Sequence, residues 1–179
     1  MSRLAFYGIF FLKGRRGKKE VQGFFDNMPL VWRALGKTEG LVKMAGAKVD
    51  ARDHPPISMK KDAGLCSAKV LSIWTDLESV HAFVYNGKHG EVFRTGKIWC
   101  VRTGVPLYAA WWIGDDHIPD WKEAYSRLNH IDEHGSDPFA FDFLSPFDDQ
   151  GRPFDMKQRV LKEKADAVNR IVVAQTRKD

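Results

Sequence analysis

The chain of 179 residues is 44% hydrophobic, which is enough for a single domain whose core needs no disulfide or metal. Its 28 basic and 23 acidic residues give a formal net charge of +5, and one basic segment lies at Lys13–Lys19. Because that segment has no interleaved aromatic residues and no nucleic-acid-binding motif follows it, we expect a solvated loop and no nucleic-acid partner.

The first apolar run and the cysteines indicate the cellular compartment of the protein. Leu4–Leu12 has nine residues, too few to cross a bilayer, and the basic cluster follows this run instead of preceding it as in a signal peptide. Cys66 and Cys100 lie far apart and fit neither a CxxC motif nor a zinc site, which is typical of free thiols in a reducing compartment. We therefore expect a cytoplasmic protein with no membrane partner.

Hydrophobic periodicity and turn residues predict alternating strands and helices. Asp76 and Asp120 are candidate helix caps, and Glu123, three residues after Asp120, would complete a capping box. Pro29 indicates a late start or a kink in the first helix, and Gly87 indicates a break or bend in a later one. In chain order we expect a strand at 4–12, a helix at 21–40, a strand at 40–49, a loop at 50–64, a strand at 66–77, a helical region at 77–102, a strand at 106–113, a helix at 121–135, an ordered coil at 136–155 and a helix at 156–179.

The order β-α-β-β-α-β, followed by further helix, predicts an α+β fold of the ferredoxin-like, split β-α-β type with helices on one face of the sheet only. In the strand expected at 106–113, the side chains of both alternating rows are apolar. The adjacent Trp111 and Trp112 must point to opposite faces of the sheet. The second face therefore needs a cover, and a second copy of the chain is the simplest one. We expect a homodimer through the sheet face, formed by a barrel domain at 1–148, with a C-terminal helical extension at 149–179.

Many residues of the stretch 65–143 match the pattern of a known family. They are Trp74, Leu77, Glu78, Phe83, Val84, Tyr85, His89, Trp99, Trp111, Trp112, His117, Pro119, Glu123, Ala124, Arg127, Leu128, Gly135, Ala140 and Phe143. On these residues the chain resembles the family called domain of unknown function 3291, of the dimeric α+β barrel superfamily.

The resemblance implies a pocket between the concave sheet and the two helices of one protomer. It also implies a range of chemistries, because the superfamily includes cofactor-free monooxygenases of polycyclic phenols, polyketide cyclases, haem-dependent enzymes and muconolactone-type isomerases. The fold alone does not choose among them.

His89 is the leading candidate for a catalytic residue. Tyr85 and Phe93, four residues before and after it, share its helical face, which is apolar and should point at the sheet. A neutral imidazole there suits proton transfer and could also ligate haem iron. The alternative is a buried histidine that only bonds a backbone carbonyl or a dimer partner. Arg94 lies about 140° round the helix from His89, so we expect it not to join that histidine.

His117, directly after the last strand, is a second candidate for proton transfer, with a hydrogen bond that fixes the turn as the alternative. Asp115 and Asp116 beside it do not predict a metal site, because three consecutive residues rarely converge on one ion. The remaining candidates are aromatic side chains that could stack a substrate or, for the tyrosines, stabilise an oxyanion, with core packing as the alternative. They are Tyr85, Tyr108, Phe93, Trp74, Trp111 and Trp112.

The leading hypothesis is a small-molecule enzyme that acts, without a cofactor, on an aromatic or polyketide-like substrate. His89 would be the base for proton transfer coupled to cyclisation, rearrangement or cofactor-independent oxygenation, with His117 or a tyrosine as its proton partner. One alternative is a haem-binding or haem-dependent protein. Another is a non-catalytic ligand-binding or assembly dimer, whose packed interior would have no pocket of roughly 300 Å³ or more.

Overall fold

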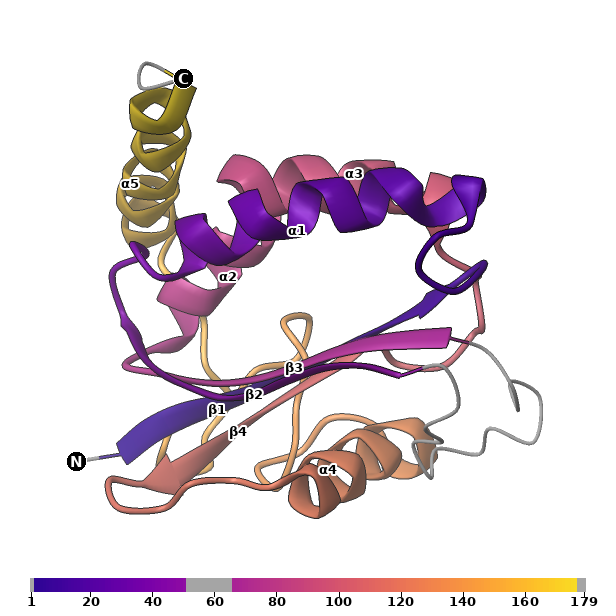
Figure 1. The fold of residues 1–179 in the computed structure, drawn as a ribbon. Helices are drawn as coiled ribbons and strands as arrows, with labels where there is room; N and C mark the ends of the chain where they lie inside the picture. Colours follow the sequence, from indigo (N-terminus) through magenta and orange to yellow (C-terminus); the bar gives the residue numbers. More distant parts are fainter. Residues whose placement is uncertain (1, 51–65, 177–179) are drawn as a thin grey trace.

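A four-stranded antiparallel sheet lies at the centre of the protein (Figure 1), which a computed structural model describes over residues 2–50 and 66–176. Within these residues the strands are β1 (Ser2–Leu12), β2 (Leu41–Asp50), β3 (Cys66–Trp74) and β4 (Tyr108–Gly114). The helices are α1 (Gln22–Leu35), α2 (Leu77–Tyr85), α3 (Gly87–Trp99), α4 (Trp121–His134) and α5 (Gln158–Thr176), with a 3-10 turn at Lys19–Val21. The α+β class predicted from the sequence is confirmed.

The strand order is β2-β3-β1-β4, so that β3 separates β1 from β2, and β1 separates β3 from β4. All three pairs of neighbouring strands are antiparallel. The register places Leu4 between Trp74 and Trp112, whereas the next residue, Ala5, lies opposite Trp111. Because side chains alternate along a strand, the two tryptophans of β4 point to opposite faces, as predicted.

One face of the sheet lies under α1, α2 and α3 (Figure 1). Its core contains Leu4 and Phe6 of β1 and Trp74 of β3, packed against apolar residues such as Val31 of α1 and Val80 of α2. These helices present apolar residues at helical spacing toward the strands, which buries the apolar stripe of each. The space between this layer and the sheet holds the cavity described below.

The opposite face is covered by α4, so the prediction of helices on one face only was wrong (Figure 1). Ala124, Leu128 and Ile131 form an apolar stripe on α4 and pack on Tyr7 and Trp111, both of which have no exposed surface. The homodimer through the sheet was predicted because this face needed a cover, and α4 of the same chain supplies it. A dimer stays a prediction.

The boundary between α2 and α3 follows from capping and from one glycine. The Asp76 carboxylate accepts the N–H of Ser79 at 2.8 Å, which satisfies a free donor in the first turn of α2. Burial alone would raise the pKa of Asp76, but hydrogen bonds from Thr75 and Ser79 and the charge of Lys164 outweigh it, so the pKa is lowered. Gly87 has a φ of +54°, a conformation that favours glycine, and the break predicted there is confirmed.

The start of α4 was predicted only in part. The Asp120 carboxylate accepts the N–H of Glu123 at 2.8 Å, and Gly135, with a φ of +81°, follows the last residue of the helix. The second half of the capping box was wrong, because the Glu123 carboxylate turns instead to the Trp111 indole N–H at 2.8 Å and to His117 Nε2 at 2.6 Å. Pro29 lies inside α1, which begins at Gln22, so a late start of that helix was also wrong.

The segment after α4 is ordered coil, as predicted. Phe141 exchanges two backbone hydrogen bonds with Ala110, so the coil extends the β4 edge of the sheet. The chain then enters α5, which lies beside α2 (Figure 1). Lys164 of α5 reaches the Ser79 hydroxyl at 2.7 Å, and the Asn169 side-chain oxygen accepts the Gly87 N–H at 2.9 Å. The last helix therefore binds the starts of both α2 and α3.

Across the described residues, no helix is both long and apolar enough to cross a bilayer. The predicted loop at 50–64, apart from Asp50 at the end of β2, lies outside those residues.

Candidate functional site

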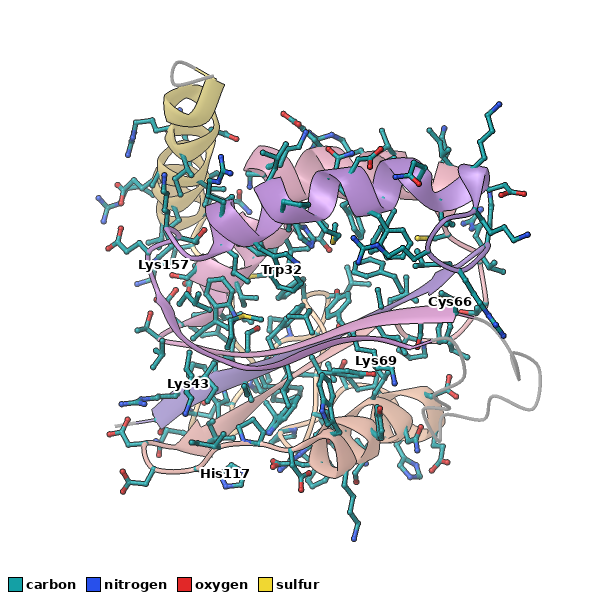
Figure 2. All side chains as sticks on the ribbon, viewed as in Figure 1. Trp32, Lys43, Cys66, Lys69, His117 and Lys157 are labelled. Carbon is teal, nitrogen blue, oxygen red and sulfur yellow. The ribbon has the colours of Figure 1, made fainter. Side chains whose placement is uncertain are left out.

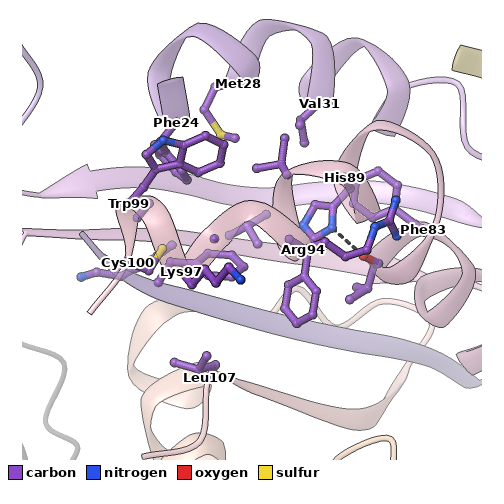
Figure 3. A pocket seen from close by; sticks show the side chains of 18 of the residues that line it. Phe24, Met28, Val31, Phe83, His89, Arg94, Lys97, Trp99, Cys100 and Leu107 are labelled. Atoms are coloured by element: carbon purple, nitrogen blue, oxygen red, sulfur yellow. Dashed lines mark hydrogen bonds between the residues drawn. The ribbon is translucent and has the colours of Figure 1, made fainter. Parts of the chain in front are cut away.

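A cavity of about 690 Å³ lies between the helical layer and the sheet. Its walls are mostly apolar, with Phe6 and Phe10 from β1, Val70 and Trp74 from β3, and Met28 from α1 among them. Figure 3 shows the side chains of α1 and α3 that share this space. The volume is in the range of small-molecule sites and is too large for the fully packed interior of a purely structural dimer.

His89 of α3 lines the cavity. Its Nδ1 lies 2.8 Å from the Val84 carbonyl oxygen, which can only accept, so Nδ1 carries the proton of this bond. In the neutral ring Nε2 then holds a lone pair, and within the described part of the chain Nε2 has no hydrogen-bond partner. Burial lowers the pKa of His89, and the bond to Val84 only partly opposes this effect. The ring is therefore a neutral acceptor at pH 7.

Arg94 lines the same cavity as His89, and no contact between the two side chains is seen among the described residues, so the prediction that Arg94 does not join His89 stays a prediction. Its Nη1 donates to the Tyr85 carbonyl oxygen at 3.2 Å. Val84 and Tyr85 end α2, and the last carbonyls of a helix have no partner within it. The end of α2 thus holds two side chains of α3, those of His89 and Arg94.

Gly90 allows this junction to close. A Cβ atom at this position would overlap the carbonyl group of Tyr85 and would lie 3.2 Å from Arg94 Nη1. Because the first obstacle is backbone, it can be relieved only if α2 and α3 move apart.

Replacing Gly90 with alanine is therefore expected to lower the free energy of unfolding by about 1–3 kcal/mol, measured by urea denaturation. Gly96, on the same helix, is the matched control, because nothing lies within 4 Å of its would-be Cβ. Gly96→Ala should raise the stability by about 0.5–1 kcal/mol, since alanine favours a helix interior. Equal effects of the two substitutions would contradict the close approach at Gly90.

The other polar groups of the cavity are less suited to proton transfer at neutral pH. The Ser72 hydroxyl accepts the Trp74 indole N–H at 2.9 Å and is buried. Burial raises the pKa of the Cys100 thiol to about 11, with a small opposing effect of Lys13, so this group stays protonated. Among the described residues of the lining, His89 is thus the side chain best suited to accept a proton at neutral pH.

Among the predicted site residues, His89, Trp74 and Phe93 line the cavity. Tyr85 and Tyr108 instead join an aromatic cluster with Phe143, with ring centroids 5.8 and 4.8 Å from it, outside the lining. The Tyr108 hydroxyl accepts the Phe143 N–H at 3.3 Å, and burial raises the pKa of Tyr108. These tyrosines are held by packing and are not brought to His89 through the cavity.

The remaining predicted site residues lie elsewhere. Trp111 and His117 share Glu123 on the α4 side, and Figure 2 shows His117 across the sheet from α1. Trp112 faces the helical side, but its indole N–H donates to the Phe147 carbonyl oxygen at 2.8 Å and it is absent from the cavity lining. The structure therefore does not bring His117, Trp111 or Trp112 together with His89. The described residues contain no group of three or more His, Cys, Asp or Glu side chains that could hold a metal ion.

The Domain of unknown function (DUF3291) family model matches residues 3–157. A search of curated proteins found no match to the chain. The matched range is wider than the stretch 65–143 that carries the resemblance in the sequence. It runs from the second residue of β1 through α4, includes every described residue of the cavity lining, and stops immediately before α5 at Gln158. The match covers most of the chain, which therefore belongs to the DUF3291 family.

Proposed function

We propose that the protein is a small-molecule enzyme in which His89 removes a proton from an aromatic or polyketide-like substrate. The observation that supports this most is a neutral histidine, fixed by the Val84 carbonyl at 2.8 Å, in a mostly apolar cavity of about 690 Å³. A base whose pKa lies near or below neutrality is free to accept a proton at pH 7. The protomer fold of this proposal is the ferredoxin-like one of the dimeric α+β barrel superfamily, which the strand order supports.

The proposed step moves one proton from an acidic C–H or phenolic O–H of the substrate to His89 Nε2. The electron pair stays on the substrate as an enolate or phenolate, whose negative charge the Arg94 guanidinium can stabilise. Cyclisation or rearrangement would return the proton from His89 to the product. Oxygenation would take O₂ as the oxidant, so that a CH₂ group becomes C=O and the second oxygen atom leaves as water.

Deuterium exchange tests the step without knowledge of the final product. Anthrone, whose ring methylene protons are acidic, should exchange them in D₂O faster with the protein than with the same concentration of imidazole, and the rate should saturate with anthrone concentration. Proton NMR measures the exchange, and an oxygen electrode shows whether O₂ is consumed. Saturable binding without faster exchange would favour a non-catalytic ligand-binding role instead.

Haem binding is the second candidate, and one observation favours it. Histidines that ligate a metal usually donate their other N–H to a carbonyl or carboxylate, as His89 does to Val84. His89 would then hold the iron through Nε2, and the iron would supply redox chemistry when bound. Titration with hemin should give a Soret band that is lost in His89→Ala, and no such band would exclude this candidate.

A further inference from the structure

The ionisable groups around the cavity have one sign of charge. Besides His89, the lining contains four cationic residues, Lys69, Arg94, Lys97 and Arg102, and no Asp or Glu among the described residues that form it. The Lys69 ammonium belongs to the other face, where it donates to the Tyr125 hydroxyl at 2.9 Å (Figure 2). The remaining three, Arg94, Lys97 and Arg102, are exposed and form what we call the cationic rim.

The rim has no carboxylate partner in the described part of the chain. The nearest acidic residue in sequence, Glu91 of α3, pairs with Lys88 at 3.1 Å. Arg94 and Lys97 are three residues apart on one helix, where like charges repel. An anion between them and Arg102 would turn this repulsion into attraction.

The helix dipole of α3 explains the presence of only one of the three cations of the rim. Lys97 lies in the last turn of α3, where the helix dipole favours a cation, but Arg94 lies earlier and Arg102 beyond the helix. The α3 carbonyls already receive another cation, since Lys13 Nζ donates to the carbonyl oxygens of Lys97 and Ile98 at 2.9 and 2.7 Å. Lys13 begins the basic segment 13–19, which therefore lies at the same end of α3 and adds to the positive potential there.

Apolar residues at the rim indicate the rest of the ligand. Phe93 and Leu107 line the cavity and are 39% and 36% exposed, so they can contact a ring that enters it. His89, Phe93 and Lys97 follow one another at four-residue steps and form one row along α3. At 1.5 Å per residue the first and last Cα atoms of this row are about 12 Å apart. A fused-ring molecule can span that row.

We infer that the substrate of the proposed enzyme is an aromatic carboxylate, with its rings in the cavity and its carboxylate at Lys97 and Arg102. The inference rests on the proposed function and adds the charge of the ligand to it. A planar guanidinium and an ammonium are the groups that bind a carboxylate most strongly in proteins. The carboxylate fixes the end of the molecule that is remote from His89, and so sets which ring carbon reaches Nε2.

The test compares two probes of nearly equal size, 1-naphthylacetate and the uncharged 1-naphthylacetamide, by isothermal titration calorimetry at low ionic strength. The acid is expected to bind the wild-type protein about tenfold more tightly, and added salt should reduce only the affinity for the acid. In the double variant Lys97→Gln, Arg102→Gln the preference should disappear while the affinity for the amide is unchanged.

The control is the double variant Arg33→Gln, Lys37→Gln, which removes the same charge from exposed positions outside the cavity lining. It should keep the preference for the acid. Equal binding of acid and amide to the wild-type protein, or equal losses in the two double variants, would overturn the inference and leave the proposed function standing. Binding of neither probe would overturn both.

Discussion

Replacement of His89 by glutamine is expected to slow substrate deprotonation by on the order of 10²–10⁴-fold, the usual contribution of a positioned general base. Glutamine has amide N–H groups that can still donate to the Val84 carbonyl, but it has no group that accepts a proton at neutral pH. The exchange rate of anthrone in D₂O measures the loss. Binding affinity should change little, because glutamine keeps a polar side chain of similar size at this position of the cavity wall.

The pH profile distinguishes the base from a merely structural histidine. Burial lowers the pKa of His89 from its ordinary value, about 6.5. Only the neutral ring accepts a proton. The wild-type rate should therefore rise with pH until the His89 ring has lost its proton, which its lowered pKa places below the ordinary value, and should be level at higher pH. His81→Gln is the control, since burial also lowers the pKa of His81 but its ring packs on Tyr85 and Phe143, outside the cavity lining. Similar rate losses in the two variants would count against His89 as the base.

Trp74→Ala should have the largest effect on stability, a loss of about 3–5 kcal/mol in the free energy of unfolding. Trp74 is 1% exposed, its ring centroid lies 5.7 Å from that of Phe83, and its indole N–H donates to the Ser72 hydroxyl at 2.9 Å. The substitution removes this packing and leaves the buried hydroxyl without its donor. Urea denaturation followed by fluorescence measures the loss.

Trp32 supplies the comparison for Trp74. It also lines the cavity, but it is 40% exposed, so Trp32→Ala should lower stability by only about 1 kcal/mol. Equal losses of stability in the two variants would show that Trp74 does not stabilise the core. Its only role in the cavity would then be contact with a ligand.

The strands and helices could be predicted from the sequence because their signals are local. Hydrophobic spacing and the caps at Asp76 and Asp120 give the elements to within a few residues. The position of α4 was missed although its signal was present. Leu128 and Ile131 lie on one face of that helix, and the helix had to bury them somewhere. Two apolar rows on β4 show that both faces are covered, but not what covers them.

The site could be predicted in part. His89 was found because its apolar helical face must meet the sheet, whereas Arg94 was missed because its side chain bends back over Gly90 to the end of α2. A helical-wheel projection shows only the direction in which each side chain leaves the helix, so it cannot show this bend. The common charge of Arg94, Lys97 and Arg102 became visible only when the chain after α3 was seen to line the same cavity as the helix.

The family match ends before α5, but the contacts of α5 show that this helix is part of the folded unit. A chain cut after residue 157, where the family match ends, would lose Asn169 as the acceptor for the Gly87 N–H and Lys164 as the donor to Ser79. It would also expose the apolar surface on which Val168 is buried. Substitutions in α5 can therefore shift the helix that carries His89 without altering any residue of the cavity, so this part of the sequence could adjust the site from outside it.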